Sequence, residues 1–125
     1  RKNDRIFTLI GIHRNGRDEL MLRVTNYKNT MVLATYYLER HLKFYDPFME
    51  MNKQGQVATV HYTSPSQVVM CQFEADGSPI GRTYFNASPG VPVRMMSHPE
   101  QGFIVQGAVQ VEAPAGSADN PGAPE

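Results

Sequence analysis

Four polar segments, each ending in a glycine, separate the apolar stretches of this sequence. They are Asn15-Gly16, Asn52-Lys53-Gln54-Gly55, Asp76-Gly77 and Pro99-Glu100-Gln101-Gly102. Asn-Gly and Asp-Gly pairs readily adopt the positive φ angles of a two-residue hairpin turn, and longer loops that contain a glycine also close hairpins. The sequence therefore predicts a protein built from consecutive β-hairpins.

The stretches between these turns have the length and composition of short strands, so the predicted fold class is all-β. We expect an antiparallel β-sandwich or jelly roll of roughly seven to nine short strands, with a closed barrel as the alternative. Residues 5–13 are apolar on both faces, which is typical of a central strand. Gly102 and Gly107 are candidates for bulges or for close backbone approach. The expected strands are residues 5–13, 19–25, 30–37, 48–51, 56–63, 67–75, 80–86, 91–96 and 103–112.

Residues 38–45 fit two different structures. Leucine, glutamate, arginine and lysine favour helix locally, so a short helix within residues 38–45 is one expectation. The β-branched and aromatic residues from 30 to 37 favour a strand, which would then continue through residues 38–45. Either element is expected to end at Asp46-Pro47, because proline has no N–H to donate to a helix or a sheet.

The composition changes at residue 113 to alanine, proline, glycine and short polar residues. Such a segment has too little apolar surface to fold alone. Residues 1–112 are therefore expected to form the β-sandwich domain, and residues 113–125 a tail or linker. Two of the tail residues are acidic, Asp119 and Glu125, and an ordered tail is expected to contact the basic N-terminal segment of an adjacent subunit.

The chain has 12 basic and 12 acidic residues, but their distribution is uneven. Residues 1–28 contain seven basic and three acidic side chains, a net charge of +4, which leaves −4 for the remainder. Charge complementarity of this kind orients association between copies of a protein. The overall charge of zero argues against nucleic acid as a partner, since nucleic-acid-binding domains are usually strongly basic.

No combination of residues indicates catalysis or metal binding. The four histidines lack the paired spacing of a zinc site, and the carboxylates are scattered along the chain. Cys71, the single cysteine, alternates with Val69 and Phe73 and is expected to be a buried, inert thiol. We therefore expect no catalytic residue, no metal ligand and no cofactor, and we favour a protein that is not an enzyme. No apolar run reaches the roughly 18 residues of a membrane span.

The leading interpretation is a non-enzymatic structural or assembly subunit of a pilus-, tail- or capsid-like polymer, whose partners are copies of itself. Sheet edges must be covered or paired, and a neighbouring subunit can provide the cover. Such a role favours a secreted, cell-surface or virion location over the cytoplasm. The candidate interaction residues are Arg1, Lys2, Arg5, Tyr36, Arg40, Lys43, Tyr45, Tyr62, Tyr84, Asp119 and Glu125.

Two other functions stay open at this point. In the first, a small molecule or carbohydrate binds loop and strand-end residues, with His61, Tyr62, Tyr84, Asn86 and His98 as contacts. Of these, His61 is expected to be half-exposed on its strand and His98 exposed in a hairpin loop. In the second, basic and aromatic residues between positions 36 and 45 bind single-stranded nucleic acid, with an affinity that falls steeply with salt.

Overall fold

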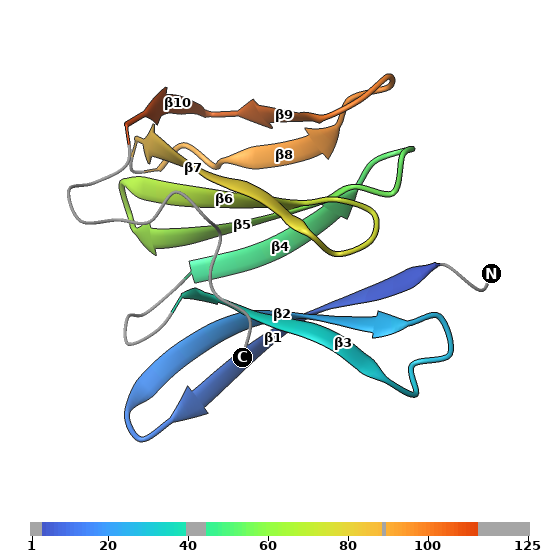
Figure 1. Ribbon diagram of the computed structural model, residues 1–125. Helices are drawn as coiled ribbons and strands as arrows, with labels where there is room; N and C mark the ends of the chain where they lie inside the picture. The colour runs from blue at the N-terminus through green and yellow to red at the C-terminus, as the bar shows by residue number, and fades with distance from the viewer. Residues whose placement is uncertain (1–3, 40–44, 89, 113–125) are drawn as a thin grey trace.

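The computed structural model describes residues 4–39, 45–88 and 90–112, and it is all-β, as the sequence predicts (Figure 1). Ten strands, all paired antiparallel, make up this part of the chain, which contains no helix. The number of strands is therefore slightly above the expected range. The strands are β1 (Arg5–Arg14), β2 (Arg17–Asn26), β3 (Val32–Glu39), β4 (Tyr45–Met51), β5 (Val57–Ser64), β6 (Gln67–Phe73), β7 (Pro79–Ala87), β8 (Arg94–Ser97), β9 (Phe103–Gln106) and β10 (Ala108–Val111).

The strands form three stacked layers (Figure 1). A three-stranded sheet has the order β1-β2-β3, a five-stranded sheet has the order β10-β7-β6-β5-β4, and a two-stranded sheet contains β8 and β9. One hydrophobic core joins the three-stranded sheet to the five-stranded sheet, and a second core joins the five-stranded sheet to β8 and β9. The five-stranded sheet is thus covered on both faces, and most residues of β5 and β6 are buried.

The predicted turns are confirmed by the backbone. Asn15 and Gly16 have φ angles of 52° and 74°, as a type I′ turn between β1 and β2 requires. The other three turns also contain a glycine with positive φ, at 81° for Gly55, 97° for Gly77 and 76° for Gly102.

The segment between β3 and β4 resolves part of the ambiguity over residues 38–45. Leu38 and Glu39 lie in β3 and Tyr45 begins β4, while residues 40–44 lie outside the described residues. Pro47 lies within β4, so the expectation that it ends the element is wrong. β4 tolerates this proline because it is an edge strand, and its pairing with β5 shifts register between Tyr45 and Phe48.

The last expected strand, residues 103–112, is divided at Gly107 into two strands. β9 pairs with β8, whereas β10 pairs with β7 in the five-stranded sheet. Gly107 has a φ of 92°, and a Cβ atom at this position would lie 2.5 Å from the carbonyl oxygen of Pro92. The expected close backbone approach at Gly107 is therefore confirmed, and it is the point where the chain passes from one sheet to another.

Cys71 lies in the core between the three-stranded and five-stranded sheets. It is fully buried, which confirms the expected buried thiol. Burial raises the pKa of this thiol from 9.0 to about 11, so that it stays protonated and poorly nucleophilic at neutral pH. The rings of Tyr36 and Phe73 fill the same core, with their centroids 5.2 Å apart.

Burial of Cys71 makes the stability of the protein depend on pH in the alkaline range. The folded state holds the thiol proton more tightly than the unfolded state, so stability is lost as the pH rises from about 9.0 to about 11. This group should lower the free energy of unfolding by about 2–3 kcal/mol across that window. Urea unfolding at a series of pH values should show a shallower decline for Cys71→Ala than for the natural chain. Equal slopes would contradict the effect.

Candidate functional site

Edge strands of a sheet expose backbone groups that can pair with another chain, and proteins discourage such pairing in recognisable ways. β4 contains Pro47, and β8, β9 and β10 have four residues each. β3 has eight residues, but its pairing with β2 shifts register near each end. Proline, short length and β-bulges all oppose the addition of a further strand. These features protect every edge of the described sheets except the one formed by β1.

β1 is ten residues long and pairs with β2 without any shift of register, from Arg5 opposite Asn26 to Arg14 opposite Arg17. Among the described residues, it pairs with β2 alone. No residue between Arg5 and His13 is charged. A long, regular and uncharged edge strand of this kind is the arrangement that most readily accepts another strand.

The sequence predicts a central position for β1, and this prediction is wrong, because β1 is an edge strand. Phe7 and Leu9 face the core between the sheets, so by alternation Ile6, Ile10 and Ile12 lie on the outer face. These isoleucines are partly exposed, and the three-stranded sheet is an outermost layer of the molecule (Figure 1). β1 is thus apolar on both faces, as central strands usually are. A central strand has two neighbouring strands, however, and β1 has only β2 among the described residues.

Exposed apolar side chains also occur beyond β1, at one end of the outer face of the three-stranded sheet. Thr25 in β2 pairs with Ile6 on one side and with Val32 of β3 on the other, so the three residues form one row across the sheet. Val32 is 55% exposed, and the neighbouring Met31 and Leu33 are exposed as well. A partner that paired with β1 would therefore extend a sheet whose outer face has apolar side chains at this end, beside the polar row of Thr8, Arg23 and Thr35.

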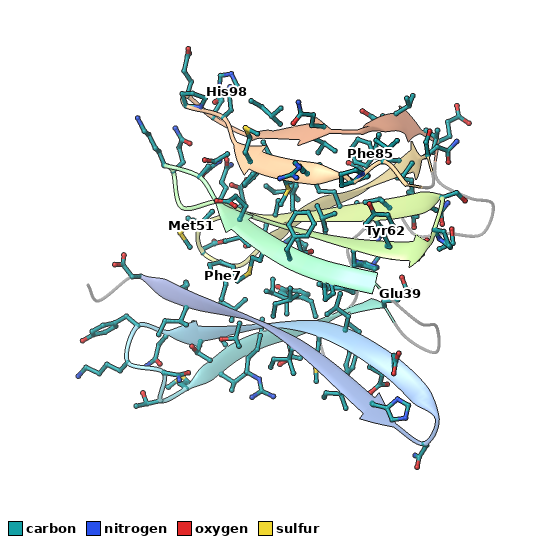
Figure 2. All side chains as sticks on the ribbon, turned by 180° about the vertical axis from the view of Figure 1, so that it is seen from behind. Phe7, Glu39, Met51, Tyr62, Phe85 and His98 are labelled. Carbon is teal, nitrogen blue, oxygen red and sulfur yellow. The ribbon has the colours of Figure 1, made fainter. Side chains whose placement is uncertain are left out.

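A β-bulge at the end of β3 turns Glu39 toward the interior. The register between β2 and β3 shifts between Leu20 and Met21, so that Leu38 has no partner of its own and Glu39 pairs with Leu20. Strict alternation would have placed Glu39 on the outer face. Instead it lies between the three-stranded and five-stranded sheets (Figure 2), with Oε1 3.0 Å from Nε2 of His61 in β5.

His61 is completely buried, so the expectation that it is half-exposed is wrong. Its strand belongs to the five-stranded sheet, and both faces of that sheet are covered. Nδ1 of His61 has no hydrogen-bond partner among the described residues, and the side chain of Glu39 is 12% exposed. Acid–base catalysis needs a substrate within reach of such a pair, whereas this pair lies in the protein core. It forms a polar link between two sheets.

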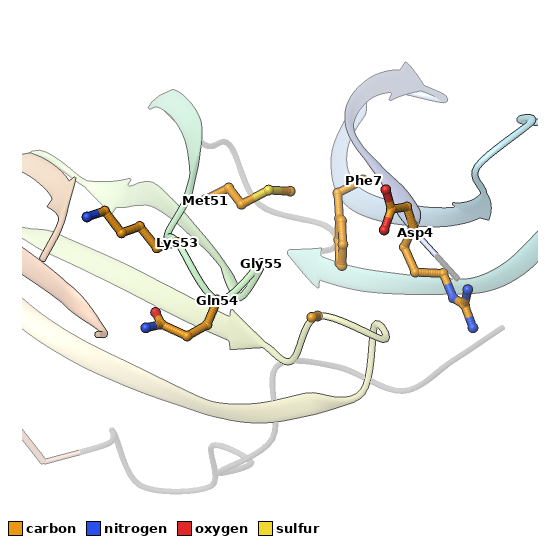
Figure 3. Close-up of a pocket in the computed structure, with 8 residues that line it drawn as sticks. Asp4, Phe7, Met51, Lys53, Gln54 and Gly55 are labelled. Atoms are coloured by element: carbon orange, nitrogen blue, oxygen red, sulfur yellow. The ribbon is translucent and has the colours of Figure 1, made fainter. Parts of the chain in front are cut away.

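The cavities on the surface of the described part include one beside Arg5 and one beside Tyr62. The larger of these two, about 320 Å³, lies between the start of β1 and the turn from β4 to β5. Figure 3 shows the side chain of Met51 pointing toward Phe7 across it, and Arg5 and Lys53 also line it. The smaller, about 280 Å³, is lined by Tyr62 and by the loops after β5 and β7. No cluster of three or more potential metal ligands occurs among the described residues.

The candidate interaction residues that the structure describes lie at several places in the fold. Tyr36 and Tyr84 are buried between the three-stranded and five-stranded sheets, and Tyr62 lines the smaller cavity. Arg5 begins β1, and Tyr45 begins β4. The other candidates lie outside the described residues: Arg1, Lys2, Arg40, Lys43, Asp119 and Glu125.

The contacts expected for a small molecule or carbohydrate also lie apart. His61 is buried and Tyr84 packs in the first core, whereas Tyr62 packs against the second core on the opposite face of the sheet. Asn86 is exposed on β7, and His98 is exposed in the β8–β9 turn, as expected. Sequence reasoning did not single out Ile6, Ile10 and Ile12 as surface residues. The signal was present, because strand 5–13 is apolar on both faces.

Comparison of the chain with protein-family models, with curated proteins and with solved structures finds no match. Among residues 4–39, 45–88 and 90–112, no helix is long and apolar enough to cross a membrane. The class of the protein is therefore given by its fold, a three-layered antiparallel all-β domain, and its candidate site is the β1 edge.

Proposed function

We propose that this protein is a non-enzymatic assembly module that associates with copies of itself through the edge of β1. The observation that carries the proposal is the unprotected β1 edge, which is long, regular in pairing and uncharged between Arg5 and His13. Backbone groups along such an edge gain hydrogen bonds, and the apolar side chains gain cover, when a further strand adds to the sheet. A polymer or a closed oligomer would both use this contact.

The other chemistry of the chain supports a non-enzymatic role. The Cys71 thiol is buried and protonated, and the Glu39–His61 pair lies in the core. A small-molecule module remains the second candidate, because the cavity beside Tyr62 has a volume of about 280 Å³. The Tyr62 hydroxyl already accepts a hydrogen bond from the backbone N–H of Val93 at 3.0 Å, which leaves it less capacity for a ligand. The nucleic-acid alternative rests on basic and aromatic residues between positions 36 and 45. Of these, Tyr36 is buried, and residues 40–44 lie outside the described residues.

A lysine placed on the β1 edge should weaken self-association, because a charged side chain on an edge strand opposes the addition of a further strand. Thr8 is exposed in the middle of β1, and Arg23 of β2 separates it from Thr35 of β3 in the same row. Thr8→Lys and Thr35→Lys therefore place the same charge next to Arg23 in one row, on opposite edges of one sheet. Thr8→Lys should raise the dissociation constant at least about tenfold, which corresponds to 1.4 kcal/mol.

Sedimentation velocity over a range of protein concentrations measures this effect. Thr35→Lys should associate as the natural chain does, since the irregular β3 edge takes no part in the contact. If both variants associate like the natural chain, or if Thr35→Lys is the one that dissociates, the β1 edge is not the contact. Circular dichroism of both variants establishes that each is folded.

A further inference from the structure

Residues 4–14, which comprise β1 and the residue before it, are arranged almost symmetrically about Leu9. Charged or titratable residues stand at both ends, with Asp4 and Arg5 before the uncharged segment and His13 and Arg14 after it. Every residue from 6 to 12 is uncharged. A strand with this symmetry can pair antiparallel with its own copy, because each position then lies opposite a position of matching chemistry.

Pairing centred on Leu9 matches the ends of the two strands. Asp4 of one copy lies opposite position 14 of the other, which is an arginine, so the two paired residues carry opposite formal charges. Arg5 lies opposite His13, whose Nδ1 is 2.7 Å from the Asp18 carboxylate of its own chain. Arg5 of each copy would therefore lie near the Asp18 carboxylate of the other copy, and the two-fold axis repeats this pair at both ends of the contact. Opposite charges at cross-strand positions stabilise a sheet, and like charges destabilise it.

The same register matches the uncharged residues. On the outer face, Ile6 lies opposite Ile12 and Thr8 opposite Ile10, since opposed residues in an antiparallel pair share a face. On the inner face, Phe7 lies opposite Gly11, so the largest side chain of the strand meets the residue that has none. An aromatic side chain across from an edge glycine is a recognised stabilising pair. Leu9 lies opposite its own copy.

Other centres of pairing lose this match. A pairing centred on Thr8 places Asp4 opposite Ile12, and a pairing centred on Ile10 places Arg14 opposite Ile6. Each places a charged residue opposite an isoleucine, so that the cross-strand pair of opposite charges is lost. If one strand slid by one residue along the other, the centre would fall between two residues. Inner-face residues of one copy would then pair with outer-face residues of the other, so the inner faces of the two sheets would point in opposite directions.

We propose that two copies of this chain pair antiparallel along β1, about a two-fold axis at Leu9, and join their three-stranded sheets into one six-stranded sheet. This inference rests on the proposed function and names its partner, a second copy, and its register. The contact is isologous, so each β1 edge is used once and no free β1 edge remains in the pair. Further growth into a polymer would then need another surface.

Cysteine cross-linking tests the register, since disulfides form when two Cα atoms lie about 4.4–6.8 Å apart. Thr8 of one copy is opposite Ile10 of the other, so a mixture of Thr8→Cys and Ile10→Cys proteins should form a covalent dimer under mild oxidation. Either variant alone should form none, because its own cysteines would be diagonal neighbours about 7–8 Å apart. Cys71 is fully buried and does not compete. Thr35→Cys, on the β3 edge, is the control for that edge.

The outcomes of this experiment distinguish a wrong register from a failure of the chain to self-associate. A covalent dimer in the Thr8/Ile10 mixture and in neither single sample supports the Leu9-centred pairing. Cross-linking of Thr35→Cys alone, or natural chains that associate without any cross-link in the mixture, overturns this pairing while the chain still self-associates. Natural chains that sediment as monomers at every concentration overturn both the pairing and the proposed function. Circular dichroism of the variants before oxidation excludes misfolded samples.

Discussion

Replacement of Gly107 by alanine is expected to lower the free energy of unfolding by about 3 kcal/mol, as the sum of two costs. A residue with a side chain at a φ of 92° loses about 1–2 kcal/mol relative to its preferred backbone conformation. The new Cβ atom would also lie 2.5 Å from the carbonyl oxygen of Pro92, and forcing apart such a contact costs about 1–3 kcal/mol more. Chemical denaturation of the purified variant measures the loss.

Gly102→Ala is the matched control for this prediction. Gly102 has a φ of 76°, and a Cβ atom there would have no atom within 4 Å, so this variant carries the conformational cost without the collision. It should lose about 1–2 kcal/mol. Equal losses for the two variants would show that a Cβ atom at position 107 does not collide with the backbone of Pro92.

Replacement of Glu39 by leucine is expected to cost about 3 kcal/mol, because it removes the hydrogen-bond partner of a completely buried histidine. Glu39→Gln keeps a side-chain oxygen 3.0 Å from Nε2 of His61 and should lose about 1 kcal/mol or less. Urea unfolding at neutral pH compares the two variants. A loss as large for glutamine as for leucine would mean that the carboxylate charge, and not its hydrogen bond, supports His61.

The double variant Glu39→Leu with His61→Leu provides a second check. Replacing both members of a buried polar pair with apolar residues of similar size is often nearly neutral, so the double variant should be more stable than Glu39→Leu alone. If the second substitution deepens the loss instead, the two residues do not act as a pair.

The turns and the strand order along the chain could be predicted from the sequence, because they depend on local chemistry. Asn15-Gly16 and the glycines at 55, 77 and 102 need a positive φ, and the structure has it at each of them. The third layer could not be predicted from local chemistry. The consecutive apolar residues from Val68 to Cys71 are typical of a strand that is covered on both faces. In a sandwich of two sheets, each sheet is covered on one face only.

The third layer also explains why His61 is buried and not half-exposed. Alternation correctly placed it on the face opposite Val60, but the burial of that face depends on the three-stranded sheet, whose packing is set by residues far away in the sequence. The contact with Glu39 was equally hidden. It requires a β-bulge at Leu38 that reverses the direction of Glu39, and the sequence contains no turn residue there that would indicate a bulge.

The candidate site has a signal in the sequence, but the pattern predicts a central strand and not an edge strand. The apolar residues on both faces of strand 5–13 led to the prediction of a central strand, on the assumption that the same chain supplies both neighbours. In the structure, β2 is the single neighbour of β1 among the described residues. Under our proposal the second neighbour is another copy, so the pattern would be that of a central strand in the assembled sheet.

Sedimentation equilibrium of the natural chain over a wide range of concentrations tests the central claim most directly. We expect the weight-average mass to rise from the 14.0 kDa of one chain toward twice that value as concentration increases. Thr8→Lys should shift this rise to higher concentrations. A mass that stays at 14.0 kDa at the highest concentrations reached would contradict self-association through β1.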